Sequence, residues 1–236
     1  MARYYQTDLA KIHDEGFSEH AEKSFNKIHK LIMKDFNSGL VVDLGCGSGV
    51  TAKKLINQGY DVYGIDYSSS MFKLAKQKVP NAKFKAGSFY SEEIPKCIAV
   101  LSIGECLNYK FDVRMNYNVL KNLFRKIYNS LEGNGIFIFD FLAENQIKNG
   151  KVEKSFIEGK NWTVLVEKKE LDREIITFYK NKSAYRKVTE THVVKLYNSN
   201  KVIALLNEIG FKVTKSHSYG DCKLRNNQTV ITAVKN

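Results

Sequence analysis

The sequence predicts an α/β protein with a mainly parallel sheet and a separate antiparallel unit. Apolar segments of strand length alternate with helical segments between residues 40 and 150, as they do in βαβ units. A glycine-rich turn follows the first of these strands, and after residue 155 the apolar residues recur at every second position. The alternation is typical of a parallel sheet, and the period of two is typical of antiparallel strands with one exposed face.

The first 39 residues are predicted to form two helices, at about 6–14 and 18–36. The second helix has one apolar face, because its large apolar side chains recur at helical spacing: Phe25, Ile28, Leu31, Ile32 and Phe36. The sequence Asn37-Ser38-Gly39 ends this helix. We therefore predict an N-terminal helical cap over residues 1–39.

The next segment supplies the parallel sheet. Strands are expected at 40–44, 61–65, 82–86, 97–103 and 135–141. Helices are expected between them, at 50–58, 69–78 and 114–131. A helix at 199–208 and strands at 211–218 and 228–235 complete this core, which we place at residues 40–150 and 196–236.

Three segments with a period of two lie between the two parts of the core, at 162–167, 174–179 and 189–197. They predict antiparallel strands joined by polar turns such as Glu170-Leu171-Asp172-Arg173. We expect this insertion, residues 151–195, to form a lid that recognises the substrate.

Composition excludes several classes of protein. With 43% hydrophobic and 12% aromatic residues, the 236-residue chain can bury a core and is not a disordered protein. No apolar run approaches the ~18 residues of a membrane helix, and the first residues lack the apolar segment of a secretory signal. The four cysteines are far apart and form no CxxC pair, so neither a zinc site nor a disulfide framework is predicted. A cytoplasmic location without a membrane partner is expected.

The net charge is +12, and 17 basic residues against 9 acidic ones place most of the surplus in residues 151–236. A surplus of this size is compatible with a nucleic-acid partner. Lysine outnumbers arginine by 31 to 6, however, whereas proteins that read bases depend on arginine. A compositional bias toward lysine is therefore the favoured interpretation.

The strongest signal for a ligand is the segment Val41–Gly49, in which a strand leads into Gly45, Gly47 and Gly49 and a helix follows. Glycines at such a turn let the backbone approach a ligand closely. The GxGxG spacing lacks the last glycine of the GxGxxG dinucleotide fingerprint, so a nicotinamide dehydrogenase is a weak alternative. Asp43 suits an ammonium group, and Asp66, at the end of the next strand, suits the hydroxyls of a ribose.

These residues resemble the class I S-adenosylmethionine-dependent methyltransferases, of the bacterial small-molecule "methyltransferase domain" type. The resemblance covers about 40–142 and 197–236. It implies a Rossmann-like sheet of seven mostly parallel strands in the order 3-2-1-4-5-7-6, with strand 7 antiparallel. It also implies S-adenosylmethionine as the cofactor and S-adenosylhomocysteine as its product.

The resemblance also implies a set of cofactor-binding residues. Asp43 and the backbone of the turn would meet the methionine part of the cofactor, with Gly45, Cys46, Gly47 and Gly49 as the turn residues. Asp66 would hold the ribose, flanked by Tyr67 and Met71. Gly87, Ser88 and Phe89 would lie near the adenine, although the family usually has an acid where Ser88 stands. Ser102 and Ile103 would border the sulfonium.

Methyl transfer needs aligned reactants and, for a neutral hydroxyl or an ammonium acceptor, a base that removes a proton. The candidate bases are His13 in the N-terminal segment, Glu105 after the strand at 97–103, and His192 in the lid. Tyr4, Tyr5, Asn108 and Tyr219 are candidates for the acceptor site. Arg186 is the candidate anchor for an anionic or carboxylate-bearing acceptor, because its guanidinium is a planar fork.

Missing motifs narrow the acceptor. Ser102-Ile103-Gly104-Glu105 stands where enzymes that methylate bases and glutamine amides carry an NPPY-type tetrapeptide. No Pro-Cys of a cytosine methyltransferase and no magnesium site of the catechol type is visible. A cytoplasmic small-molecule N- or O-methyltransferase, monomeric or homodimeric, is the favoured hypothesis. An RNA methyltransferase and a non-catalytic cofactor-binding protein are the alternatives.

Overall fold

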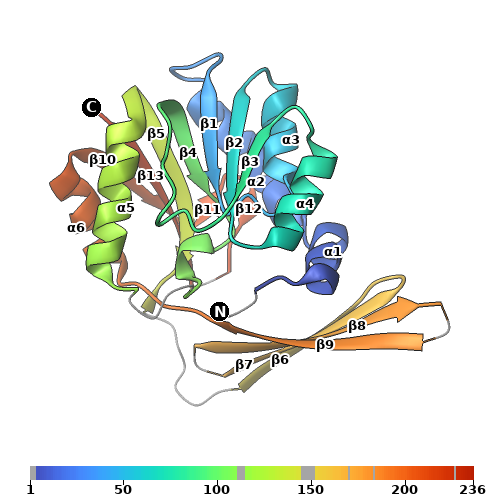
Figure 1. The fold of residues 1–236 in the computed structure, drawn as a ribbon. Coiled ribbons are helices and arrows are strands. Elements are labelled where there is room, and N and C mark those ends of the chain that lie inside the picture. Colours follow the sequence, from blue (N-terminus) through green and yellow to red (C-terminus); the bar gives the residue numbers. More distant parts are fainter. Residues whose placement is uncertain (1–3, 111–114, 145–151, 170, 183, 226) are drawn as a thin grey trace.

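The computed structural model describes residues 4–110, 115–144, 152–169, 171–182, 184–225 and 227–236. Its centre is a seven-stranded sheet in the order β10-β13-β5-β4-β1-β2-β3 (Figure 1). The strands are β1 (Leu40–Leu44), β2 (Asp61–Asp66), β3 (Lys83–Ala86), β4 (Cys97–Ser102), β5 (Leu131–Leu142), β10 (Phe211–Ser216) and β13 (Gln228–Lys235). β13 runs antiparallel to both of its neighbours, β10 and β5, and the other pairs of neighbouring strands in this sheet are parallel. The predicted fold class and strand order are therefore confirmed.

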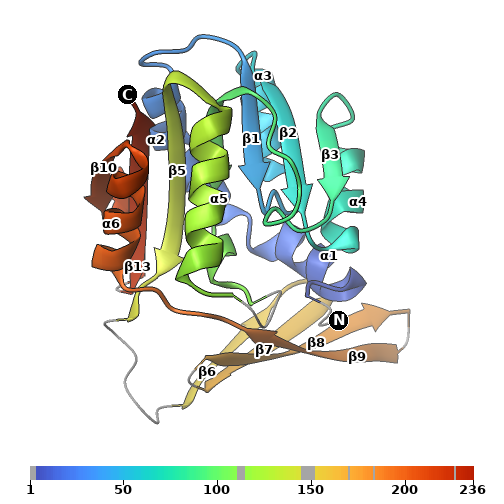
Figure 2. The same ribbon diagram turned by 60° about the vertical axis from the view of Figure 1, so that its left-hand side comes forward.

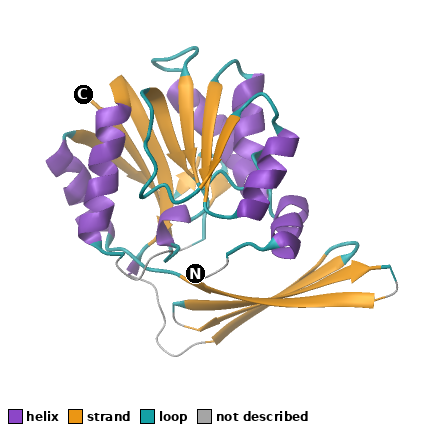
Figure 3. Ribbon diagram, in the orientation of Figure 1, coloured by secondary structure: helices purple, strands orange, loops and turns teal. Residues whose placement is uncertain are grey.

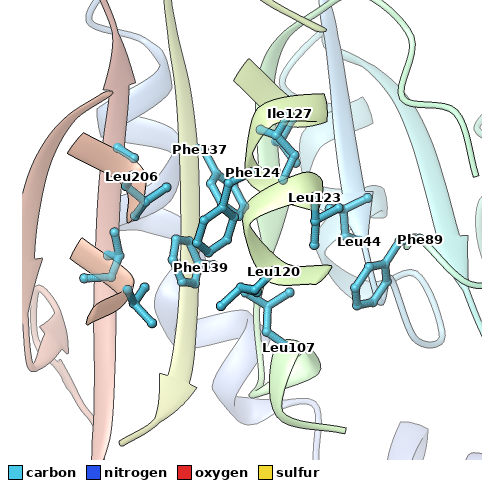
Figure 4. Close-up of a cluster of buried hydrophobic side chains, with 14 of the residues drawn as sticks. Leu44, Phe89, Leu107, Leu120, Leu123, Phe124, Ile127, Phe137, Phe139 and Leu206 are labelled. Atoms are coloured by element: carbon cyan, nitrogen blue, oxygen red, sulfur yellow. The ribbon is translucent and has the colours of Figure 1, made fainter. Parts of the chain in front are cut away.

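Helices cover both faces of this sheet (Figure 2). The structure has α2 (Glu19–Ile32), α3 (Val50–Asn57), α4 (Ser69–Lys78), α5 (Tyr117–Ser130) and α6 (Ser199–Ile209). On one face, α5 and α6 bury leucines and phenylalanines against β5, as Phe124, Phe137 and Phe139 do in Figure 4. On the other face, α2 and α3 pack against β1 and β4. None of the helices within the described ranges is long and apolar enough to cross a membrane.

Some predicted bounds need correction, and the helix predicted at 114–131 spans only Tyr117–Ser130 because β5 begins at Leu131. The helix predicted at 18–36 ends at Ile32, and Phe36 follows it in a turn in which its backbone N–H donates to the Ile32 carbonyl. Phe36 still packs against the core, which explains its place in the apolar pattern. The first helix, α1 (Thr7–Gly16), extends two residues beyond its predicted end at 14.

The insertion is a four-stranded antiparallel sheet, separate from the central one (Figure 3). Its strands are β6 (Val152–Glu158), β7 (Trp162–Lys169), β8 (Asp172–Asn181) and β9 (Ala184–Val193), and we call it the lid. Every residue of β6 is exposed, so its sequence carries no alternation that could have predicted this fourth strand. A two-residue hairpin, β11 (Ser218–Tyr219) and β12 (Cys222–Lys223), also lay outside the prediction.

The lid faces the carboxyl ends of the parallel strands, and α1 lies between it and the core (Figure 1). Leu9 and Ile12 of α1 pack against Trp162, Val164 and Ile175 on the inner face of the lid. The far end of α1 is bound to the core, because Asp14 accepts a hydrogen bond from Ser48 and pairs with Lys78. The N-terminal segment therefore joins the lid to the glycine turn.

Candidate active site

The glycine turn links β1 to α3 in left-handed conformations. Gly45, Gly47 and Gly49 have φ values of +79°, +55° and +81°, which side chains rarely allow. A Cβ atom at Gly45 would lie 2.5 Å from the Cys106 sulfur, whereas one at Gly47 would meet no described atom within 4 Å. The turn is therefore tightly packed on one side and has open space at Gly47, where a ligand can approach the backbone.

Two carboxylates flank this turn. Asp43 is 3% exposed, and among the described residues its Oδ2 has no hydrogen-bond partner. Asp66 accepts hydrogen bonds from the N–H of Gly47 and from the N–H of Ser68, each at 2.8 Å. Burial, together with the charge of Asp66, raises the pKa of Asp43 to about 7. Burial also raises the pKa of Asp66 to about 6, against the lowering effect of its two backbone donors.

These features fit the cofactor that the resemblance implies. A buried carboxylate oxygen without a partner is costly, and a bound ammonium group would satisfy it. The carboxylate of Asp66 has further lone pairs for ribose hydroxyls while it holds the turn. Met71 is buried at the start of α4, and Tyr67 directly follows Asp66.

The other cofactor candidates have roles in the fold. Ser102 is fully buried and donates from its hydroxyl to the Leu44 carbonyl at 3.1 Å, which joins β4 to β1. Phe89 lies in the hydrophobic core beneath α5, and the Ser88 hydroxyl accepts a hydrogen bond from the N–H of Tyr90. Cys46 is buried and Ile103 is partly exposed at the end of β4.

Aromatic and histidine side chains from distant parts of the sequence meet beneath the lid. The Tyr5 and Tyr109 hydroxyls are 2.7 Å apart, and the His192 ring centroid lies 5.0 Å from Tyr5 and 4.8 Å from Tyr4. His13 contacts the other side of Tyr5, with ring centroids 5.2 Å apart. Tyr5 has a φ of +50°, and such strain in a residue other than glycine is common at functional sites.

His192 is oriented by a carboxylate on the same strand. It is fully buried, and its Nε2 lies 2.9 Å from Oε2 of Glu190. The other oxygen of Glu190 accepts a hydrogen bond from the N–H of Gln6 at 2.9 Å. Nε2 therefore carries the proton, and the Nδ1 lone pair, which has no partner within the described ranges, is left to accept one.

The remaining base candidates are less suited to proton removal. Burial lowers the pKa of His13 to about 4, which makes it a weak base. Glu105 is buried and paired with Arg173, whose Nη2 lies 2.8 Å from its Oε2. Burial and the neighbouring Tyr109 raise the pKa of Tyr5 well above 10, so its hydroxyl keeps its proton.

Three acceptor-site candidates lie outside this group. Both amide atoms of Asn108 bind the backbone of Leu142 and Lys195, so this side chain connects the lid to β5. The guanidinium of Arg186 is paired with the carboxylate of Asp8 on α1. The Tyr219 hydroxyl donates to Asp140 at 2.8 Å. The anchor predicted at Arg186 is therefore already occupied by a partner within the chain.

Asp140 is a buried carboxylate that organises the loop after β4. It accepts hydrogen bonds from the N–H groups of Gly104 and Glu105, from Tyr219 and from Gln228. Glu105 has a φ of +64°, so these bonds hold a strained backbone in place.

Replacing Asp140 with Ala is expected to lower the free energy of unfolding by about 3–5 kcal/mol, because several buried donors lose their acceptor. Urea denaturation measures this change, and Asp221→Ala, which removes an exposed carboxylate, is the matched control. An equal, small effect of both variants would contradict the role given to Asp140.

Comparison with known proteins supports a methyltransferase. Residues 41–135 match the sequence profile of a family described as a methyltransferase domain. The strand order of the central sheet, in which only β13 is antiparallel to the other strands, agrees with that match. These findings support a class I S-adenosylmethionine-dependent methyltransferase. The predicted family, enzyme class and cofactor are thereby confirmed.

The methyltransferase is similar to several known proteins. A putative methyltransferase of Bacillus subtilis strain 168 is 23% identical over 219 residues, which are 87% of this chain and 85% of the relative. An S-adenosylmethionine-dependent methyltransferase from Clostridium acetobutylicum has a TM-score of 0.81 at 16% identity, over 97% and 98% of the two chains. The amino pentose methyltransferase of calicheamicin biosynthesis from Micromonospora echinaspora has a TM-score of 0.76 at 14% identity, over 100% and 99%.

Four residues of the methyltransferase site were absent from the sequence prediction: Tyr109, Asp140, Arg173 and Glu190. Two of them carried a usable signal. Asp140 is the one acid in the apolar strand segment GIFIFDF, and a carboxylate there needs buried partners. Glu190 stands two residues before His192, so in a strand both side chains lie on one face. Tyr109 and Arg173 carried no such local signal.

Proposed function

We propose that the enzyme transfers a methyl group from S-adenosylmethionine to a nitrogen or oxygen of a small molecule, by in-line displacement at the carboxyl ends of β1 and β4. The observation that carries this is a pair of buried polar atoms without a hydrogen-bond partner among the described residues. They are the Asp43 Oδ2 at the glycine turn and the His192 Nδ1 on the inner face of the lid. One fits the cofactor, and the other fits proton removal from an acceptor.

The cofactor-binding residues follow from the geometry of the turn. Asp43 would bind the ammonium group, the open backbone at Gly47 would lie against the methionine part, and Asp66 would bind the ribose hydroxyls. When bound, S-adenosylmethionine supplies a methyl group on a sulfonium that is its own leaving group. The protein's contribution is to orient the acceptor, exclude water and remove a proton.

His192 is the proposed base. Glu190 accepts a hydrogen bond from the Nε2–H group of His192 and thereby fixes the tautomer. Its negative charge also stabilises the imidazolium that forms when Nδ1 takes up the proton of the methyl acceptor. Tyr4, Tyr5 and Tyr109 pack around the His192 ring and would shield it from water. The lid thus carries the base, while the core holds the cofactor.

The similarity to an amino pentose methyltransferase supports an amine as the reacting group. The proposed base is fully buried among tyrosines, which suits a small acceptor better than a nucleic-acid strand. The test is incubation of the purified protein with methyl-labelled S-adenosylmethionine and pools of small amines and hydroxyl compounds. Mass spectrometry of a labelled small product would support the proposal. Label only in added tRNA or rRNA would contradict it.

The two acids at the turn give a pH dependence. Their pKa values in the folded protein, about 7 and about 6, exceed the value of 3.8 for a solvated aspartate. Each protonated acid therefore contributes to the free energy of unfolding of the ligand-free protein, and the contribution is complete below pH 3.8. It is lost as the pH rises through the folded-state pKa values of about 6 and about 7.

A bound ammonium group favours the ionised acids, so S-adenosylhomocysteine binding is expected to release protons at about pH 6 and few at about pH 8.5. Calorimetry in two buffers of different ionisation enthalpy counts the released protons. Binding without proton release at the lower pH would contradict the assignment of Asp43.

A further inference from the structure

We propose that Lys168 and Arg225 form a binding site for an anionic group of the methyl acceptor, a carboxylate or a phosphate. The site lies where the lid meets the loop after β4. This inference rests on the proposed function, since it describes a second part of the same acceptor. It replaces Arg186, whose guanidinium is paired with Asp8.

The register of the lid places the cations beside the proposed base. Glu153, Lys168, Arg173 and His192 are direct cross-strand neighbours in β6, β7, β8 and β9. They form one row on the inner face, because His192 is buried under the tyrosines and Arg173 reaches Glu105 in the core. Neighbouring strands lie about 4.8 Å apart, so Lys168 stands about 10 Å from the base, two strands away.

The row and its surroundings hold more positive than negative charge. Arg173 is matched by Glu105, with its Nη2 2.8 Å from Oε2. The second oxygen of Glu105 lies 3.7 Å from Arg225, and Glu153 lies 3.9 Å from the Lys168 ammonium. Both of these distances are at the limit of an ion pair, so Lys168 and Arg225 keep most of their capacity for hydrogen bonds to an anion.

The three cations also repel one another. Lys168 stands directly opposite Arg173, and like charges at facing positions destabilise a sheet. Burial, followed by the charges of Arg225 and Arg173, lowers the pKa of Lys168. An anion bound between Lys168 and Arg225 would relieve this repulsion, as positive clefts attract negative ligands.

Exposure leaves the site open to a ligand. The Arg225 side chain is 66% exposed and that of Lys168 is 33% exposed, whereas Arg173 beneath them is 13% exposed. A small acceptor could therefore place its reacting nitrogen or oxygen at His192 and its anionic group at Lys168, about 10 Å away. An acceptor of this kind is an anionic amine or alcohol of roughly that length.

The experiment measures anion binding to the protein saturated with S-adenosylhomocysteine. Calorimetric titrations with inorganic phosphate and with succinate would be made on the unmodified protein, Lys168→Gln, Arg225→Gln and the double variant. The matched control is Lys187→Gln, which removes an exposed lysine elsewhere on the lid. The ligand that binds more tightly shows whether the site prefers phosphate or carboxylate.

We expect saturable binding of at least one anion, weakened about tenfold by each single variant and unchanged by Lys187→Gln, since a charge-assisted hydrogen bond contributes about 1.5–3 kcal/mol. The absence of saturable binding of both anions, or equal affinity in Lys168→Gln, Arg225→Gln and the control, would overturn the site. Failure of the proposed function is seen separately, because the protein would then give no labelled small product with methyl-labelled S-adenosylmethionine, whatever its affinity for anions.

Discussion

Replacing His192 with Gln is expected to lower kcat by about 100-fold or more, while the affinity for S-adenosylhomocysteine stays within about twofold. General base catalysis commonly contributes ~10²–10⁴-fold, and the base carries no part of the cofactor site. Glutamine is close to histidine in size and can still donate to Glu190, so the fold and the buried carboxylate keep their partner. Steady-state kinetics with the identified acceptor and calorimetry with S-adenosylhomocysteine measure the two quantities.

His217→Gln is the matched control, because His217 is exposed and lies between β10 and β11, outside the lid. Glu190→Gln adds an independent readout. It removes the negative charge that stabilises the imidazolium, so kcat should fall while the affinity for S-adenosylhomocysteine stays unchanged. Unaltered kcat in His192→Gln would exclude this base and leave the cofactor site unaffected.

Replacing Asp66 with Asn is expected to weaken S-adenosylhomocysteine binding by about 10- to 100-fold. In the proposed site the carboxylate would make charge-assisted hydrogen bonds to the ribose hydroxyls, each contributing about 1.5–3 kcal/mol. In this variant an NH₂ group replaces one carboxylate oxygen, and it cannot accept the hydrogen bond from the N–H of Gly47 or Ser68. Some destabilisation of the glycine turn is therefore expected. Urea denaturation measures that part separately from the loss of affinity.

Asp61→Asn is the control for Asp66, because Asp61 is exposed at the other end of β2. Its affinity for S-adenosylhomocysteine should match that of the unmodified protein. If Asp66→Asn binds as tightly as Asp61→Asn, the ribose lies elsewhere.

The core was predictable because its signals are local. The apolar run at 97–103, the glycines after β1 and the acid at Asp66 each reflect a conformation that neighbouring residues determine. Strand order followed from the family resemblance, since sequence periodicity alone does not order a sheet. The helix predicted at 18–36 was too long because Phe36 fits the apolar pattern of the helix. It makes its contact with the core from the turn that follows the helix.

The site was less predictable because its contacts join distant segments. Tyr5 and Tyr109 are 104 residues apart, and Arg173 meets Glu105 across 68 residues. Nothing in the sequence shows that Arg186 finds Asp8, or that the amide of Asn108 is used by backbone groups. The lid was predicted as the basic part of the molecule, but which of its cations face the core depends on register.

A crystal structure with S-adenosylhomocysteine tests the central claim most directly. The account predicts ribose hydroxyls within hydrogen-bond distance of Asp66, the ammonium group at Asp43, and the sulfur facing Tyr5, Tyr109 and His192. A ligand bound at the turn with its sulfur directed away from His192, or a ligand bound elsewhere in the fold, would contradict it.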